Sequence, residues 1–285
     1  MTDVLSIEHP REAVKVLRMN RPDTLNALDL ELVAALHREF DVLASDRSTR
    51  IVVLTGAGRG FCAGLDLGGY GDVPGTEQSG AVHRTLARQD DIASLVQKIR
   101  RLPQVFVAAV NGPAAGGGFA LVSASDVRIA AESAVFAVSF IKVGFSGCDI
   151  GTSWLLPRIV GAGRAHELML TARKFDADEA LRIGLLADVV PDDQLDGRIE
   201  TCLDDLLAAP PLSLALTKRG MWLSLEMPSF DTAVEFEWLV TQPWPDNTGT
   251  RSTIGSASPG RIGFSVRHGH CATAYTPRSQ RSARC

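Results

Sequence analysis

Few features of this 285-residue sequence point to charge-driven binding or to a membrane. The net charge is −4, from 29 lysines and arginines against 33 aspartates and glutamates, and the basic residues are scattered along the chain. Proteins that bind nucleic acid or lie on membrane surfaces usually gather basic residues on one face, so we expect neither partner. No apolar run approaches the roughly 18 residues of a membrane-spanning helix, and no signal-peptide core opens the chain. A cytoplasmic protein is therefore expected.

Cysteine is also sparse, which bears on metal sites and disulfides. There are five cysteines, and no two of them form the C-x-x-C pair that is typical of a metal site. Their spacing provides no disulfide framework either. We expect reduced, mostly buried thiols and no bound metal.

The sequence does contain enough apolar residues for a large core. Hydrophobic residues make up 45% of the chain, which suits one main domain with a smaller C-terminal part. Strand and helix patterns alternate in the first half, whereas from residue 152 the pattern is almost entirely helical. This order predicts an α/β core with a helical C-terminal layer. The predicted strands are 4–7, 14–19, 50–55, 105–110, 126–131 and 134–138, and the predicted early helices are 29–43, 82–102 and 117–124.

Three consecutive glycines, Gly116 to Gly118, join the predicted strand 105–110 to a helix. The first N–H groups of a helix lack internal partners and lie at the positive end of the helix dipole. Glycine leaves such an N–H uncovered by any side chain. This junction is therefore suited to hold negative charge that develops on an oxygen atom.

A second glycine-rich segment, residues 56–71, follows the predicted strand 50–55. One interpretation is the G-x-G-x-x-G fingerprint of dinucleotide-binding proteins. The third glycine of that fingerprint would fall on Phe61, and no helical pattern follows directly, so this interpretation is disfavoured. The other interpretation is a plain flexible loop. The loop combined with the later strand–GGG–helix junction is a more specific pattern than either part alone.

Taken together, these stretches resemble the crotonase superfamily, also called the enoyl-CoA hydratase/isomerase family. The resemblance covers about residues 3–238, and its order and spacing are specific. It implies an α/β fold built as a crotonase-type spiral of ββα units over residues 1–190. A helical region at 191–240 is implied to form a homotrimer, often paired into a homohexamer. The stretches that carry it are NRPDTLNAL (20–28), GRGFCAGLDL (58–67), VNGPAAGGG (110–118), SDVRIA (125–130) and LPRIVG (156–161).

The resemblance also implies an activity on acyl-CoA thioesters in fatty acid and lipid metabolism. Coenzyme A is then part of the substrate, and no separate cofactor is expected. The backbone N–H groups of Ala63 and Gly117 are implied to hold the thioester oxygen as an oxyanion hole. Leu25, Ala63, Asp66 and Leu67 are implied to lie near coenzyme A. For Asp66 a second interpretation stays open, that of a carboxylate that caps its own loop.

The sequence departs from the hydratases of this family at two positions. Hydratases use two glutamates to activate water, and those positions hold Ala120 and Phe140 here. Neither side chain can carry a proton, so standard hydration is not expected. A nearby carboxylate, Asp149, stands where some members place their working aspartate. It is either a base for isomerase-type proton transfer or a residue that stabilises the next helix N-terminus.

Two functions therefore remain open at this point. One is an acyl-CoA enzyme in which Asp149 transfers a proton. The other is a non-catalytic acyl-CoA carrier or sensor, which the loss of both glutamates favours.

The last segment, residues 241–285, differs in composition from the rest of the chain. It is rich in Gly, Ser, Thr and Arg and has no helical period. This composition predicts a disordered tail. A shifted reading frame in the underlying gene is a second hypothesis for it.

Overall fold

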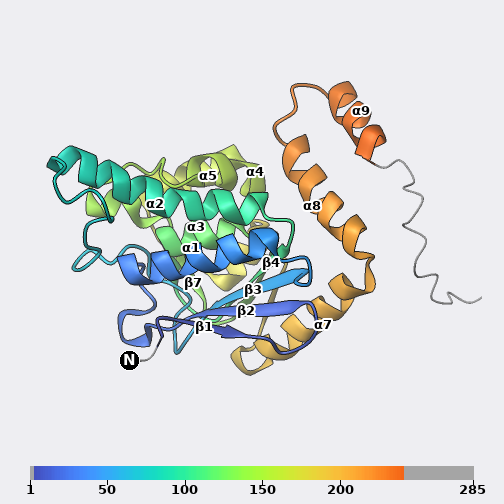
Figure 1. Cartoon of the computed structure of the whole chain (residues 1–285), viewed down its shortest axis with the longest axis horizontal. Helices are drawn as coiled ribbons and strands as arrows, with labels where there is room; N and C mark the ends of the chain where they lie inside the picture. The colour runs from blue at the N-terminus through green and yellow to red at the C-terminus, as the bar shows by residue number, and fades with distance from the viewer. Residues whose placement is uncertain (1–2, 241–285) are drawn as a thin grey trace, which may run out of the picture. The chain divides into compact units, whose positions relative to one another are not determined.

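The structure is a computed structural model, and it describes residues 3–240. A six-stranded sheet lies at the centre of this part of the chain. The strand order is β1-β2-β3-β4-β6-β9, in which β1 is antiparallel to β2 and the other neighbours are parallel. Figure 1 shows β1 to β4 of this sheet. The predicted tail, residues 241–285, lies outside the described residues. The strands are β1 (Leu5–Glu8), β2 (Val14–Met19), β3 (Ile51–Gly56), β4 (Val105–Val110), β6 (Val127–Ala131) and β9 (Asp188–Val190).

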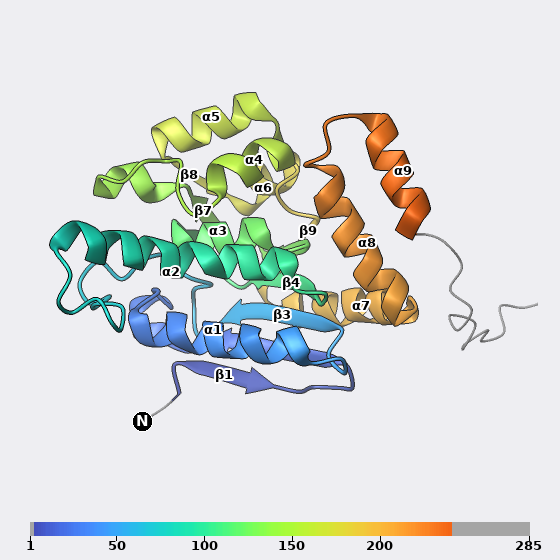
Figure 2. The ribbon, with the colours of Figure 1, turned by 45° about the horizontal axis from the view of Figure 1, so that its top comes forward.

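A second, three-stranded sheet has the order β5-β7-β8. Figure 2 shows β7 and β8 of this sheet among helices α3 to α6. Its strands are β5 (Ala114–Ala115), β7 (Val135–Ala137) and β8 (Lys174–Asp176). The helices are α1 (Leu30–Ser45), α2 (Ala81–Arg101), α3 (Gly117–Ala124), α4 (Thr152–Val160), α5 (Ala162–Thr171), α6 (Ala177–Arg182), α7 (Leu195–Ala208), α8 (Pro211–Ser224) and α9 (Phe230–Val240). Three short 3-10 helices are η1 (Pro22–Thr24), η2 (Ser139–Val143) and η3 (Asp192–Gln194).

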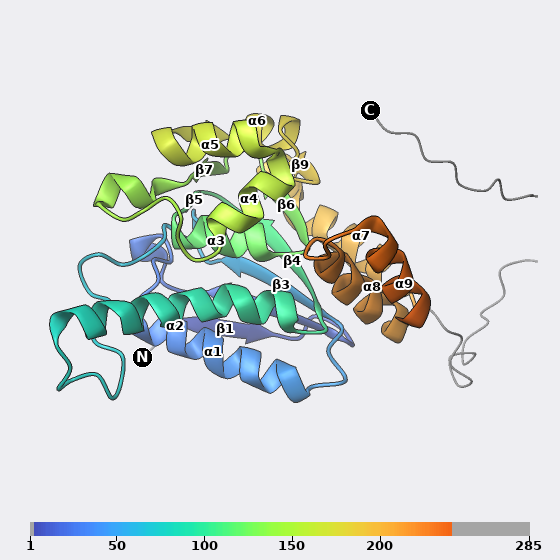
Figure 3. The same ribbon diagram turned by 90° about the horizontal axis from the view of Figure 1, so that it is seen from above.

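The main sheet is buried on both faces. Along β3, Val52 and Leu54 belong to the core beneath α1, α2 and α3, whereas Ile51 and Val53 belong to a second core with α7. Side chains alternate between the faces of a strand, so a strand covered on both sides must be apolar throughout. This explains the continuous apolar run of β3. Figure 3 shows α1 and α2 side by side over one face.

Most of the predicted elements are present, with one systematic error in the second half. The helix predicted from Asp29 is α1, and the Asp29 carboxylate caps it by accepting the Leu32 N–H at 2.9 Å. The region beyond residue 152 is not entirely helical, because β8 and β9 lie within it. Each of these strands has three residues. A run this short shows no period of its own, and its pairing with β7 or β6 defines it.

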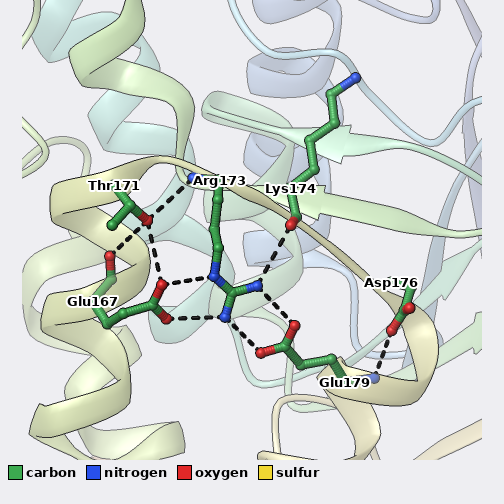
Figure 4. Close-up of polar contacts among 6 residues, drawn as sticks. All are labelled: Glu167, Thr171, Arg173, Lys174, Asp176 and Glu179. Carbon is green, nitrogen blue, oxygen red and sulfur yellow. Dashed lines mark hydrogen bonds and ion pairs between the residues drawn. The ribbon is translucent and has the colours of Figure 1, made fainter.

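An arginine clamp joins α5 to α6 across β8 (Figure 4). The Arg173 guanidinium donates to both carboxylate oxygens of Glu167, at 2.6 and 2.9 Å, and to both of Glu179, at 2.8 and 2.6 Å. These hydrogen bonds lower the pKa of both glutamates. The clamp therefore stabilises the fold above the ordinary glutamate pKa and weakens as the pH falls. It holds the chain around β8 in place beside β7.

The C-terminal helices are attached to the body by a buried lysine. The Lys218 ammonium on α8 lies 2.9 Å from the Asp126 carboxylate and donates to the carbonyls of Ile99 and Gln104, both at 2.7 Å. Beyond this anchor, α8 and α9 expose several large apolar side chains. These include Leu212, Met221, Leu225, Phe230 and Val234.

The domain boundary predicted at residue 190 falls at the end of β9 and stays a prediction. Within residues 3–240, no helix combines the length and the apolar character needed to cross a membrane.

Candidate functional site

A small cavity forms where the loop after β3, the start of α3 and the segment 139–150 meet. Its volume is about 90 Å³, which is space for only a few water molecules. The cavity is lined mainly by apolar side chains, and its polar members are Gln89, Ser139 and Asp149. A larger cleft of about 680 Å³ between α2 and α8 contains none of the predicted site residues. The apolar lining consists of Leu28, Leu65, Leu67, Ile92, Phe140, Val143, Phe145 and Ile150, with Ala63.

The glycine junction has the geometry that the sequence predicts. Gly116 has a φ of +48°, and the chain enters α3 directly after it. The Gly117 N–H donates to no carbonyl in the described part of the chain. A Cβ on Gly118 would lie 2.1 Å from the Cys62 carbonyl oxygen, so the junction and the earlier loop pack backbone against backbone. Glycine is required here for close approach as well as for an uncovered N–H.

The loop amide expected to partner Gly117 is already engaged. The Ala63 N–H donates to the Leu25 carbonyl at 2.9 Å, so it is not available to a ligand, and this part of the expectation is wrong. The expectation for Ala63 came from the family resemblance and not from the hydrogen bonds of the loop. The bend at Leu25, where φ is +52°, brings the Leu25 carbonyl to Ala63.

The N–H of Leu65, two residues further on, is free instead. Leu28 donates to the Gly64 carbonyl at 2.7 Å and accepts from the Asp66 N–H at 2.9 Å, so 64–66 pairs with Leu28 as a parallel strand would. In that pattern the N–H of the central residue, Leu65, is directed away from Leu28. No carbonyl within residues 3–240 accepts from it. A Cβ on Gly64 would lie 3.2 Å from the Gly117 nitrogen, so the loop and the junction are in contact.

Two asparagines that sequence analysis did not single out hold this loop. Asn26 is fully buried and donates to the carbonyls of Ala57, at 3.0 Å, and Gly60, at 2.7 Å. Its side-chain oxygen accepts the Arg21 N–H at 2.8 Å. Asn111 likewise donates to the Gly56 carbonyl at 2.9 Å. Both asparagines lie within the motifs quoted above, and nothing else in the sequence indicated that they hold the loop.

Asp66 has a structural role in the same loop. Its carboxylate lies 3.0 Å from the Arg21 guanidinium, which also contacts Asp29 at 3.1 Å, and it accepts the Gly68 N–H at 3.2 Å. These bonds support the loop-capping interpretation. Neither Asp66 nor Leu25 lines the cavity, whereas Leu67 does and is 63% exposed. The contacts of these three residues with coenzyme A stay a prediction.

Asp149 lines the same cavity from the loop before α4. Its Oδ1 accepts hydrogen bonds from the Ile150 N–H, at 2.7 Å, and from the Gln89 side chain on α2. Partial burial among apolar side chains raises the pKa of Asp149, and the Ile150 hydrogen bond offsets part of that rise. A raised pKa is what a carboxylate needs to accept and return a proton near neutral pH.

The alternative role for Asp149, a cap on α4, does not agree with the hydrogen bonds. Gly151 is the N-cap of α4, and no side chain caps this helix. The Asp149 backbone carbonyl accepts the Thr152 N–H at 2.8 Å, but its carboxylate bonds to no amide of the first helical turn. The Asp149 carboxylate therefore does not cap α4.

Ala120 and Phe140, the positions that the resemblance assigns to the two glutamates of hydratases, offer no second acid. Ala120 is fully buried within α3 and does not line the cavity. Phe140 in η2 lines the cavity and is 6% exposed. Among the described residues around the cavity, Asp149 is the only one with an acidic or basic side chain. The arrangement thus combines two free amides with one carboxylate.

Comparison with known proteins places this geometry in context. A family description, "Enoyl-CoA hydratase/isomerase", matches residues 9–247. The Mycobacterium leprae protein named "Probable enoyl-CoA hydratase echA12" is 39% identical over 242 residues, which are 84% of this chain and 81% of that protein. The 1,2-epoxyphenylacetyl-CoA isomerase of Escherichia coli K12 is 35% identical over 231 residues, which are 81% and 86% of the two chains.

The fold is similar to that of solved structures as well. A crystal structure described as a probable enoyl-CoA hydratase/isomerase from Mycobacterium abscessus has a TM-score of 0.78 and 32% identity. The match covers 83% of this chain and 88% of that one. The crotonase-type α/β fold expected from the motifs is thereby confirmed.

Proposed function

Because this chain belongs to the enoyl-CoA hydratase/isomerase family, we propose that it is an isomerase, which moves a double bond in an enoyl-CoA thioester by proton transfer through Asp149. An acyl-CoA thioester is the substrate class of the family. The similarity to an isomerase acting on another acyl-CoA supports this choice of reaction. A place in fatty acid or lipid metabolism follows from the same substrate class.

One observation carries the proposal: two free backbone amides and a single carboxylate share one small, mainly apolar cavity. The thioester oxygen accepts hydrogen bonds from the N–H groups of Leu65 and Gly117. The Asp149 carboxylate removes a proton from the α or γ carbon, and the electron pair moves onto that oxygen as an enolate. Each amide then stabilises the negative charge by about 3 kcal/mol.

In the second half of the reaction a proton returns from Asp149 to the substrate, and the half-buried carboxyl group can first exchange that proton with solvent. Protonated Asp149 delivers it to the other carbon of the allylic system, and the carbonyl reforms as the double bond settles in its new position. No water enters and no atom is lost, so the step balances with one acid–base group. Hydration needs an acid and a base around one water molecule, and the replacements at Ala120 and Phe140 disfavour it.

The volume of the cavity limits which part of the substrate can bind inside it. A volume of about 90 Å³ suits the thioester and the adjacent carbons but not coenzyme A. The pantetheine arm then leaves past the exposed Leu67, near Leu25 and Asp66. Exposed apolar side chains on α8 and α9 support assembly of the helical region 191–240 into a trimer or a hexamer.

Parallel substrate assays test the proposal. The protein is incubated with 3-enoyl-, 3,5-dienoyl- and crotonyl-CoA, and the conjugated thioester absorbance is followed. We expect a change in conjugation with the first two and no loss of absorbance with crotonyl-CoA. In D₂O, deuterium is expected at the α or γ carbon of the product in the wild type and not in Asp149→Asn.

Two outcomes would contradict the proposal. Hydration of crotonyl-CoA at a rate above isomerisation would assign the chain to the hydratases despite Ala120 and Phe140. Saturable binding of all three thioesters, without turnover and without deuterium exchange, would favour the carrier or sensor.

A further inference from the structure

Among the residues that the structure describes, Gln89 on helix α2 is the side chain that donates to the Asp149 carboxylate, and we propose that it is a positioning residue for proton transfer. The inference rests on the proposed function, because it concerns the group assigned there as base. Gln89 is 60 residues from Asp149 in the sequence, and no motif includes it. Its role depends on α2 crossing the cavity beside the loop that precedes α4.

The hydrogen bonds around Asp149 are asymmetric. The Gln89 Nε2 and the Ile150 N–H both donate to Oδ1. The described residues form no hydrogen bond to Oδ2. Oδ2 is also not among the buried polar atoms that lack a partner, so it is accessible from outside the protein. One oxygen is thus fixed by two donors, while the other keeps its lone pairs for a substrate proton.

The Gln89 carboxamide can donate a hydrogen bond to Asp149 both when Asp149 is ionised and when it is protonated. An ionised carboxylate only accepts hydrogen bonds, so the Gln89 amide group must present its NH₂ to it. When Oδ2 takes a proton, Oδ1 still accepts the same two donors, and the side chain need not turn. The carboxyl group therefore keeps one orientation while its charge changes, which limits reorganisation during the reaction.

Few other charges act on this carboxylate. Arg88 and Asp90 flank Gln89 on α2, and Lys142 lies on η2. Arg88 is paired with Asp72, and none of these charged residues lines the cavity. Cys148 is the titratable neighbour in the chain, and its side chain is exposed outside the cavity lining. Gln89 is accordingly the polar side chain that contacts the Asp149 carboxylate within residues 3–240.

The test measures the protonation of Asp149 directly, without relying on turnover. Protein labelled with ¹³C at the aspartate carboxyl is titrated by NMR, and the Asp149 signal is identified by its absence in Asp149→Asn. Gln89→Met keeps the length of the side chain but removes the donor. Because a hydrogen bond to the charged form lowers its pKa, we expect the pKa of Asp149 to rise by about one unit in Gln89→Met.

Gln97→Met is the matched control. Gln97 is on the same helix, is exposed, and has no hydrogen bond to any described residue, so its replacement should leave the titration unchanged. In the isomerase assay, Gln89→Met should lower kcat about 10-fold with little change in KM, and shift the acid limb of the pH profile upward. Gln89→Glu places a second carboxylate there and should raise the apparent pKa further.

Failure of this inference differs from failure of the proposed function. An unchanged Asp149 titration in both Gln89→Met and Gln89→Glu would overturn the role of Gln89, even if the wild type is an isomerase. A wild type without turnover would overturn the proposed function, while a shifted titration would still support the contact. If Gln89→Met does not fold, as judged by circular dichroism, Gln89→Glu alone decides.

Discussion

The cavity has two walls that are held in different ways. The amide wall, residues 56–69 with the start of α3, is packed backbone against backbone, and Asn26 and Asn111 tie its loop at several carbonyls. In the acid–base wall, residues 139–150, residues 141–146 are exposed and Asp149 is held by one side chain and its own backbone. The proposed oxyanion donors are thus fixed by main-chain packing, whereas the proposed base depends on a side-chain contact.

The largest expected effect separates chemistry from binding at the acid–base wall. Asp149→Asn removes the only acidic or basic side chain that lines the cavity within residues 3–240, and it keeps the shape of the side chain. We expect isomerisation to fall by about 10²–10⁴-fold, with the affinity for the thioester retained. Steady-state rates and calorimetric binding of an enoyl-CoA measure the two quantities. Full activity of Asp149→Asn would show that the proton moves through another group.

The next effect concerns the amide wall, where there is no room for a side chain at Gly118. In Gly118→Ala the new Cβ would approach the Cys62 carbonyl oxygen at 2.1 Å, and neither backbone can move alone. The free energy of unfolding should decrease by at least about 3 kcal/mol. Gly163→Ala, in α5 with nothing within 4 Å, is the control and should be neutral or slightly stabilising. Equal urea midpoints for the two variants would refute this account of the wall.

A smaller effect is expected from the asparagine that ties the loop. Asn26→Ala removes the donor to the partly buried Ala57 carbonyl and leaves the buried Gly60 carbonyl with only the longer bond from Asn111, at 3.4 Å. Alanine is also less suited to the φ of +57°. The expected loss of stability is roughly 2 kcal/mol. Asn20→Ala, which removes one exposed hydrogen bond to the Asp3 carbonyl, should cost much less. Urea unfolding of both variants makes the comparison.

The smallest effect is a pH dependence of stability at the acid–base wall. The pKa of Asp149 is raised by burial, so its protonated form favours folding, and this contribution is lost as the pH rises through the raised pKa. Asp149→Asn should therefore gain stability relative to the wild type between pH 4 and pH 7, approximately the range above the ordinary aspartate pKa. The gain is expected to be small, because the carboxylate is only partly buried. A gain that instead grows toward low pH would contradict the raised pKa.

The candidate site was predictable where it depends on local backbone and less so elsewhere. The glycine junction at Gly117 was identified because a helix start and three glycines are adjacent in the sequence. The partner amide was assigned to Ala63 rather than Leu65, because the direction of an N–H in a loop depends on which distant strand-like segment pairs with it. Gln89 could not be found, because a contact across 60 residues leaves no pattern in either segment.

The sequence by itself determined the alternation of strands and helices, the apolar cores and the absence of an acidic side chain at positions 120 and 140, because burial and residue chemistry are encoded position by position. The tertiary structure alone decided which amides are free, which carboxylates are engaged in the fold, and which residue faces Asp149. It also decided that β8 and β9 exist, since three residues become a strand only when a neighbouring strand supplies their hydrogen bonds. Hydrogen bonding is a pairwise property of the folded chain, and for groups far apart in sequence only the fold brings the pairs together.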